Sequence, residues 1–320
     1  MQWKDRRVLF FSGLFLVLAL PGLIFLFRSP VLIVTDAPFM EIYGASRIKQ
    51  RQAGASFALF RRVKPAPAAE NAGPDLIVFA VEAAASRPYG VIFPYRYADG
   101  ARRYAARHPR VRVVILDSRP DMDGDAAGPP ERGRAAGEPA FVRTRRQDDF
   151  YRAGLCAALA ARSRQVPATE KPGPGGDAAA GREILVFQEQ TLSPADKSAL
   201  SAGLRARGAG IQPRFLNSPA EYEGVADASC VILTGGAAEY LNLNLKIPVI
   251  LFSWLDPALT SRETFVIFDD SPWALAGEAL RQAKRGEGDG VPSKPVFPPG
   301  RIADRRLARE LRRAAGSLHP

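Results

Sequence analysis

Side chains able to bind a ligand stand where short apolar runs of this chain end. They are Asp36, Glu82, Tyr95, Asp117, Gln188, Gln190, Thr234, Trp254 and Asp256, with Phe39 and Arg146 a few residues beyond such runs. The buried strands of a parallel sheet are short apolar runs, and α/β proteins bind ligands outside the carboxyl ends of those strands. Gln188 and Gln190 alternate along one run, so both can face the same side. The pattern predicts a binding site assembled from these side chains.

Each candidate also has a structural interpretation. In PVILFSWLDP (248–257), Trp254 could stack on a ligand ring or cover the edge of the core. Asp256 could accept hydrogen bonds from ligand hydroxyls or an amine, or cap the following helix. Asp36 is likewise a ligand contact or a helix cap, and Phe39 a lid aromatic or a hydrophobic staple. The sequence is compatible with both interpretations at all four positions.

Arg146 and Thr234 carry similar alternatives. Arg146 could pair with an anionic group of a ligand, or with Asp148 or Asp149 in the same stretch, RTRRQDD. Thr234 opens a Thr-Gly-Gly loop whose backbone amides could bind an anion. The same loop is also a plain strand-to-helix turn.

The chain shows no pattern typical of catalysis. His108 and His319 are its only histidines, and no nucleophile elbow or metal-ligand cluster occurs. Cys156 and Cys230 lie in apolar runs and are expected to be buried free thiols. We therefore expect no enzyme, no cofactor and no metal.

The N-terminus predicts a membrane anchor. Residues 8–27 form an uncharged run of about 20 residues, long enough to span a bilayer as one transmembrane helix. The basic flank MQWKDRR before it favours a soluble part outside the cytoplasm. A cleaved signal peptide is the alternative, although no small-x-small cleavage site follows. The expected location is the cell (inner) membrane, single-pass, with the soluble part periplasmic or extracellular.

The net charge of +11 does not by itself indicate nucleic-acid binding. Proteins that bind nucleic acid gather their positive charge on one helix or patch. Here arginine is scattered, apart from the C-terminal stretch 301–313, which carries six arginines against two acids. No nucleic-acid partner is expected.

Strand-like and helix-like runs alternate along the chain, which is typical of α/β folds with parallel sheets. Strands are expected at 31–36, 57–63, 75–82, 90–96, 111–118, 141–146, 183–190, 213–217, 230–236, 248–254 and 264–270. Helices are expected at 40–52, 97–108, 147–164, 193–208, 237–246 and 271–286. Two proline- and glycine-rich inserts, 119–139 and 165–181, have no apolar period and are expected to be flexible.

These runs predict two α/β lobes. The expected domains are an anchor at 1–28, an N-terminal lobe at 29–118, an insert at 119–139, a C-terminal lobe at 140–270, and a segment at 271–320 that returns through the hinge and ends in a basic helix. A cleft between two lobes is a favoured place for a ligand.

Three stretches carry a resemblance to a known family. They are VRVVILDS followed by FVRTRRQDDFYRAGLCAALAA, then CVILTGGAAEYL, and PVILFSWLDPALTSRETFVIFDDSPWALAGEAL. Together they resemble the type I periplasmic substrate-binding fold, nearest its basic-membrane-protein group of nucleoside-binding lipoproteins. They are also similar to the sugar-binding domains of regulators of the lac-repressor type.

The resemblance implies two Rossmann-like lobes joined by a hinge and closing around a small polar ligand. It places Asp117 at the hinge and implies an ABC-type permease as partner. Two features depart from the nucleoside-binding group: no lipidation cysteine follows the apolar run, and TDAPFM (35–40) replaces a glycine- or serine-rich loop. The alternative function is a degenerate binding fold that serves as a regulatory or structural module through protein contacts.

Overall fold

The computed structural model describes most of the chain in two compact units. The described residues are 22–36, 45–69, 71–117, 137–163, 183–188, 192–207, 211–217, 221, 228–234, 246–252, 263–285 and 290–317. Unit 1 comprises residues 1–117, 130–142 and 276–288, and unit 2 comprises 118–129, 143–275 and 289–320. Most of the predicted span, most of the first insert, the whole second insert and nearly all of the predicted helix 237–246 lie outside the described residues.

In the part of the chain that the structure describes, no helix is both long and apolar enough to cross a membrane. Of the predicted span, only residues 22–27 are described, and they are helical.

Unit 1 is built on a five-stranded sheet in the order β2-β1-β3-β4-β5. The strands are β1 (Val31–Asp36), β2 (Val63–Ala68), β3 (Gly90–Pro94), β4 (Arg112–Asp117) and β5 (Ala140–Arg143). β1 pairs in parallel with β2 and β3, and β3 pairs in parallel with β4. All six residues of β1 are buried, as expected of a strand covered on both faces.

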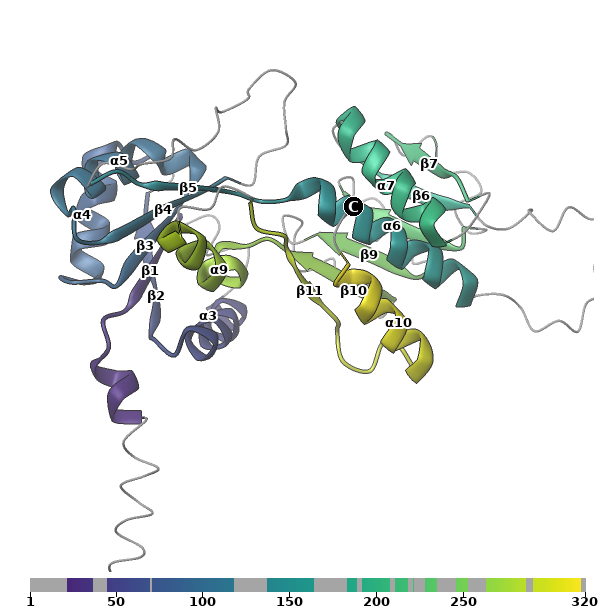
Figure 1. Cartoon of the computed structure of the whole chain (residues 1–320), viewed down its shortest axis with the longest axis horizontal. Helices are drawn as coiled ribbons and strands as arrows, with labels where there is room; N and C mark the ends of the chain where they lie inside the picture. Colours follow the sequence, from purple (N-terminus) through teal and green to yellow (C-terminus); the bar gives the residue numbers. More distant parts are fainter. Residues whose placement is uncertain are drawn as a thin grey trace, which may run out of the picture. The chain divides into compact units, whose positions relative to one another are not determined.

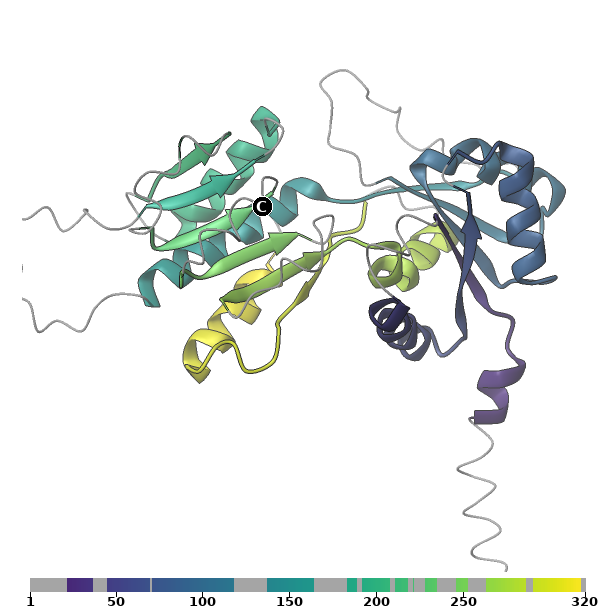
Figure 2. The ribbon, with the colours of Figure 1, turned by 180° about the vertical axis from the view of Figure 1, so that it is seen from behind.

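Helices cover both faces of this sheet (Figures 1 and 2). They are α3 (Ala45–Leu59), α4 (Pro74–Ala84), α5 (Ala98–Arg107) and the second half of α9 (Pro272–Arg285), and a 3-10 turn at Tyr95–Tyr97 precedes α5. Ile77 and Val81 of α4 share a core cluster with Tyr104 of α5. This α/β arrangement with parallel strands confirms the predicted fold class for unit 1.

The predicted strand at 75–82 is wrong, because these residues form α4. A short apolar run is compatible with a strand or a buried helix, and here Pro74 at the first helical position decides for the helix. Ile77, Val78 and Val81 face inward, whereas Leu76 and Phe79 remain exposed.

The predicted strand at 57–63 is also displaced. α3 continues to Leu59, and β2 begins at Val63. β2 contains Pro65 and Pro67, which cannot donate to a sheet ladder, and β2 lies at the edge of the sheet, where proline is tolerated.

Unit 2 is built on a six-stranded sheet in the order β11-β10-β9-β8-β6-β7. The strands are β6 (Ile184–Phe187), β7 (Pro213–Leu216), β8 (Cys230–Leu233), β9 (Val249–Phe252), β10 (Thr264–Asp269) and β11 (Lys294–Val296). The apolar runs of the sequence predicted all of these strands except β11, which pairs antiparallel with β10. β11 was missed because Lys-Pro-Val has no apolar alternation.

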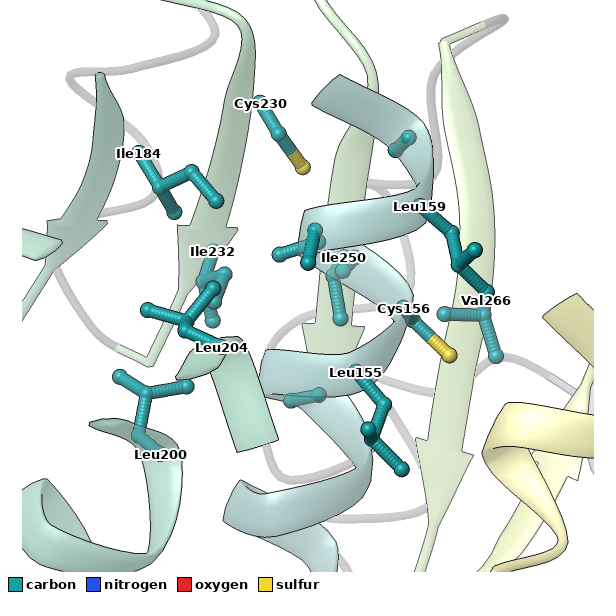
Figure 3. Packing of buried hydrophobic residues seen from close by; sticks show 14 of the residues in the cluster. Leu155, Cys156, Leu159, Ile184, Leu200, Leu204, Cys230, Ile232, Ile250 and Val266 are labelled. Carbon is teal, nitrogen blue, oxygen red and sulfur yellow. The ribbon is translucent and has the colours of Figure 1, made fainter. Parts of the chain in front are cut away.

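One face of this sheet is covered by α6 (Arg146–Ser163), α7 (Pro194–Arg207) and α10 (Arg305–Ala315). Figure 3 shows Leu155, Cys156 and Leu159 of α6 in the same apolar cluster as Ile232 and Ile250 of the strands. The opposite face of the sheet carries its own apolar cluster, which includes Leu185, Val231 and Leu251.

Cys156 and Cys230 are buried free thiols, as predicted. Burial raises the pKa of Cys156 to about 12. The thiol therefore stays protonated at neutral pH and is inert as a nucleophile.

Helices α6 and α7 touch along their backbones at two glycines. A Cβ atom on Gly154 would meet the carbonyl oxygen of Leu200, and one on Gly203 would meet the carbonyl oxygen of Tyr151. Any larger residue at either glycine must push the two helices apart.

A buried ion pair fixes the other side of α6. Arg152 contacts Asp149 and donates to the carbonyl and hydroxyl oxygens of Ser293 at 3.0 Å, and to the carbonyl of Ala315 at 3.0 Å. Its guanidinium also lies 5.2 Å from the ring centroid of Phe268. Burial raises the pKa of the Asp149 carboxyl, and the Arg152 guanidinium acts in the opposite direction. Arg152 thus ties α6 to α10 and to the segment before β11.

Gly203→Ala is expected to destabilise the protein by about 3 kcal/mol, the upper part of the usual range for overpacking a core. Gly54→Ala is the matched control, because Gly54 also lies inside a helix but a Cβ there meets nothing within 4 Å. The control should gain up to about 1 kcal/mol from helix propensity. Urea unfolding of both variants gives the comparison. Equal effects of the two substitutions would contradict the close contact of α6 with α7.

Candidate ligand-binding site

At the carboxyl edge of the unit 1 sheet, an acid and an arginine meet. Asp36 ends β1, and Arg96 follows β3, the neighbouring strand. Their side chains form an ion pair in which Asp36 is buried and Arg96 is half exposed. The Arg96 guanidinium also lies 5.0 Å from the ring centroid of Tyr97. A buried carboxylate with a half-exposed cation above it can hold a polar group that arrives from solvent.

Two more predicted residues stand at the same edge. Asp117 ends β4 and is 5% exposed, and Tyr95 follows β3 and packs partly against the unit 1 core. Thr35, which the sequence did not single out, has a buried hydroxyl without a hydrogen-bond partner among the described residues. Buried polar atoms are nearly always satisfied, so this hydroxyl is an additional candidate contact.

Glu82 does not belong to this edge. It lies near the C-terminus of α4, the helix that leads into β3, and therefore at the amino end of the sheet. Its carboxylate lies 2.8 Å from Nε2 of His108. The prediction that Glu82 ends a strand is wrong, because these residues form a helix, and its predicted ligand contact loses the argument on which it rested.

At the carboxyl edge of the unit 2 sheet, Arg146 and Asp196 form the principal charged pair. α6 precedes β6 and α7 follows it, so both helices begin at this edge. Nε of Arg146 lies 3.2 Å from a carboxylate oxygen of Asp196, which is 1% exposed. Ser193 caps α7 by accepting from the backbone N–H of Asp196.

Arg146 pairs with Asp196, an acid that is not among the alternatives suggested for it by the sequence. Asp148 pairs with Arg145 at 2.8 Å, and Asp149 pairs with Arg152. Asp196 was missed because it lies 50 residues along the chain from Arg146. The only available signal was an acid in the first turn of a capped helix that follows a strand.

Amide and hydroxyl groups complete the unit 2 edge. Nε2 of Gln188 donates to Oδ1 of Asn217 at 2.5 Å, and Oε1 accepts from the backbone N–H of Leu192 at 3.1 Å. The hydroxyl of Thr234 donates to the carbonyl of Phe187 at 2.9 Å. Gln188 and Thr234 stand where predicted, and their hydrogen bonds tie the ends of neighbouring strands together.

Asp269 and Asp270 at the end of β10 were not selected from the sequence, although they satisfy the same rule as Asp36. Both are buried, and Asp269 accepts from the backbone N–H of Ser271 ahead of α9. Four other predicted residues lie outside the described residues: Phe39, Gln190, Trp254 and Asp256. Among the described residues, no group of three or more histidine, cysteine, aspartate or glutamate side chains could hold a metal ion.

Comparisons with known proteins bear on the fold. No protein-family model matches the chain, and no curated protein matches it. A solved ABC transporter solute-binding protein from Conexibacter woesei is similar with a TM-score of 0.55 and 13% identity, over 90% of this chain and 95% of that one. A transcriptional activator of the comK gene from Bacillus halodurans is similar with a TM-score of 0.51 and 7% identity, over 90% and 96%.

At these identities the likeness concerns the fold alone. The chain has the fold of type I periplasmic substrate-binding proteins, which confirms the resemblance noted from its sequence.

Arg146→Met is expected to cost about 3 kcal/mol, because removing one partner leaves the other charge of a buried pair uncompensated. Arg281→Met is the control, since the pair of Arg281 with Glu278 is largely exposed and should contribute less than about 1 kcal/mol. Denaturant unfolding compares them. If Arg146→Met costs no more than the control, the Arg146–Asp196 pair is not a structural element of this edge.

Proposed function

We propose that the protein is a non-catalytic receptor for a small polar solute. The observation that carries the proposal is the placement of a buried acid and a more exposed arginine at the carboxyl edge of each parallel sheet. Asp36 and Arg96 form this pair in unit 1, and Asp196 and Arg146 form it in unit 2. Open α/β sheets bind ligands at this edge.

The chemistry of the edges suits recognition by hydrogen bonds. A guanidinium offers several N–H donors in a fixed plane, and a carboxylate accepts from hydroxyl or amino groups. The amides of Gln188 and Asn217 add one donor and acceptor set in unit 2. A solute that carries both hydroxyl or amino donors and oxygen acceptors fits this set, and the similarity to a solute-binding protein supports the proposal.

The remaining reactive groups give no support for catalysis. His108 stands at the amino end of the unit 1 sheet beside Glu82, away from the paired groups. Cys156 is buried and its pKa is raised to about 12. Among the described residues, these two groups lie outside the paired edges and do not support a catalytic role for them.

The cellular setting belongs to the same proposal. The uncharged run 8–27 with its basic flank supports a single-pass tether in the inner membrane, with the receptor outside the cytoplasm. A receptor of this kind delivers its solute to an ABC-type permease, which we propose as the partner.

A second candidate function is a regulatory module that acts through protein contacts. One observation favours it: the acid and the arginine of each edge pair with each other, and at the unit 2 edge the amides of Gln188 and Asn217 do the same. An edge of this kind loses binding energy whenever a solute displaces an internal partner. The similarity to a transcriptional activator is compatible with this candidate.

A thermal-shift screen with sugars, nucleosides and amino acids tests the receptor. A solute at about 100 times its Kd adds about 2.7 kcal/mol to the free energy of unfolding, so one class should raise the melting temperature. Arg146→Met should lose most of this shift relative to its own baseline. Arg281→Met removes the same positive charge at an exposed position and should retain the ligand-induced shift in melting temperature.

If no class raises the melting temperature, or if Arg146→Met and Arg281→Met retain the same shift, the receptor proposal fails at this edge. In the first case the regulatory module becomes the better explanation.

A further inference from the structure

A groove of about 640 Å³ lies in unit 1, and neither Asp36 nor Arg96 lines it. It is formed by residues 22–25, α3 and the start of β2. Its apolar walls include Phe25, Phe57 and Phe60, and its basic lining residues are Lys49, Arg62 and Lys64. The groove therefore combines aromatic rings with positive charge in one place.

The aromatic side chains around this groove are poorly covered by the protein. Phe57 is 87% exposed and Phe60 is 41% exposed. Phe27, in the adjoining helical segment, is 81% exposed, and Leu23 and Leu26 are more than half exposed. Single exposed apolar residues are ordinary, but a contiguous group of them marks an interaction surface.

The charge of the described residues from α3 to the end of β2 has one sign. Residues 45–69 contain six lysines and arginines and no acid. The Nε atom of Arg62 is buried and has no hydrogen-bond partner in the described part of the chain. An anionic group that enters the groove would meet Lys49, Arg62 and Lys64 together, without a nearby carboxylate from α3 or β2 to oppose it.

The groove adjoins the end of the uncharged run 8–27. The ring centroids of Phe25 and Phe60 are 5.9 Å apart, and the guanidinium of Arg28 lies 5.1 Å from the Phe60 ring centroid. Arg61 donates to the carbonyl of Ser29 at 3.2 Å, which holds the connection to β1 beside the same turn. The C-terminal end of the uncharged run 8–27 therefore borders the groove.

Phe60 is held in an unusual conformation. Its φ angle is +49°, in the left-handed region that bulky residues rarely adopt. The turn is fixed on both sides, because Gln52 donates to the carbonyl of Val63 at 2.7 Å and Ser56 accepts from the Val63 N–H at 2.9 Å. The turn thereby holds the ring of Phe60 partly exposed beside the groove.

We propose that this basic aromatic groove docks unit 1 onto a bilayer surface that contains anionic phospholipid. The rings of Phe57 and Phe60 enter the boundary between headgroups and acyl chains, and Lys49, Arg62 and Lys64 contact the lipid phosphates. Aromatic residues and lysine or arginine are the side chains that suit this interface. The inference rests on the proposed tether for its position beside the membrane, and it does not depend on solute binding.

Bromine-labelled lipid tests the docking. The full chain carrying Phe57→Trp is reconstituted in vesicles of phosphatidylcholine and phosphatidylglycerol with brominated acyl chains, which quench tryptophan at the interface. Phe79→Trp is the matched control, because Phe79 is an exposed phenylalanine (68%) of the same unit on α4. Both variants keep Trp3, Trp254 and Trp273, so the difference reports the new position.

Quenching of the Phe57→Trp protein should exceed that of the Phe79→Trp protein at least about twofold. The excess should disappear in phosphatidylcholine alone, and in a Phe57→Trp chain that also carries Lys49→Glu and Lys64→Glu. Flotation of the vesicles reports whether the chain is membrane-bound in each sample.

Equal quenching of the two variants in chains that float contradicts the docking and leaves the tether intact. An excess that is unchanged without phosphatidylglycerol also contradicts it, because the basic residues would then have no part. A chain that does not float contradicts both the tether and the docking. The solute screen is read separately and is unaffected by any of these results.

Discussion

The buried Arg152–Asp149 pair is the interaction on which the organisation of unit 2 depends. Arg152 is 3% exposed, and it donates to groups from α6, from the segment before β11 and from the end of α10. Removing either charge would leave the other uncompensated in the core. The pair therefore holds α6 in place against α10 and the segment before β11. The glycine contact with α7 fixes its other side. The same helix begins with Arg146, and its fixed position brings Arg146 to Asp196 at the carboxyl edge of the sheet.

The polar edges of the two units follow a common design. Each has a buried acid at the end of a strand or the start of a helix, and an arginine that is more exposed than the acid. In such a pair the arginine lies at the edge, where a solute can reach it, and its charge is compensated by the acid when no solute is bound. A solute must then replace an internal hydrogen bond with a better one, which favours ligands rich in donors and acceptors over apolar ones. The same self-pairing is what a regulatory module without a ligand would show, so binding itself decides between the two functions.

Much of the fold could be predicted from the sequence, because apolar runs bounded by proline, glycine and serine caps determine strands and helices locally. The run at 75–82 was misassigned because its length and composition suit either element, and only the packing of Ile77 and Val81 resolves it. β11 was missed because its position depends on pairing with β10 and on no pattern of its own. At the site, positions were predictable and partners were not. Arg146 pairs with an acid 50 residues distant, a contact that local charge spacing cannot reveal.

Native mass spectrometry of the full chain, after incubation with an extract of polar metabolites and removal of free small molecules, tests the receptor function most directly. A receptor predicts one stoichiometric small-molecule adduct on the wild-type chain, released on denaturation and strongly reduced in Arg146→Met. Arg281→Met should retain the adduct. Detection of the bare chain alone, while an established solute-binding protein keeps its ligand in the same extract, would contradict the receptor function.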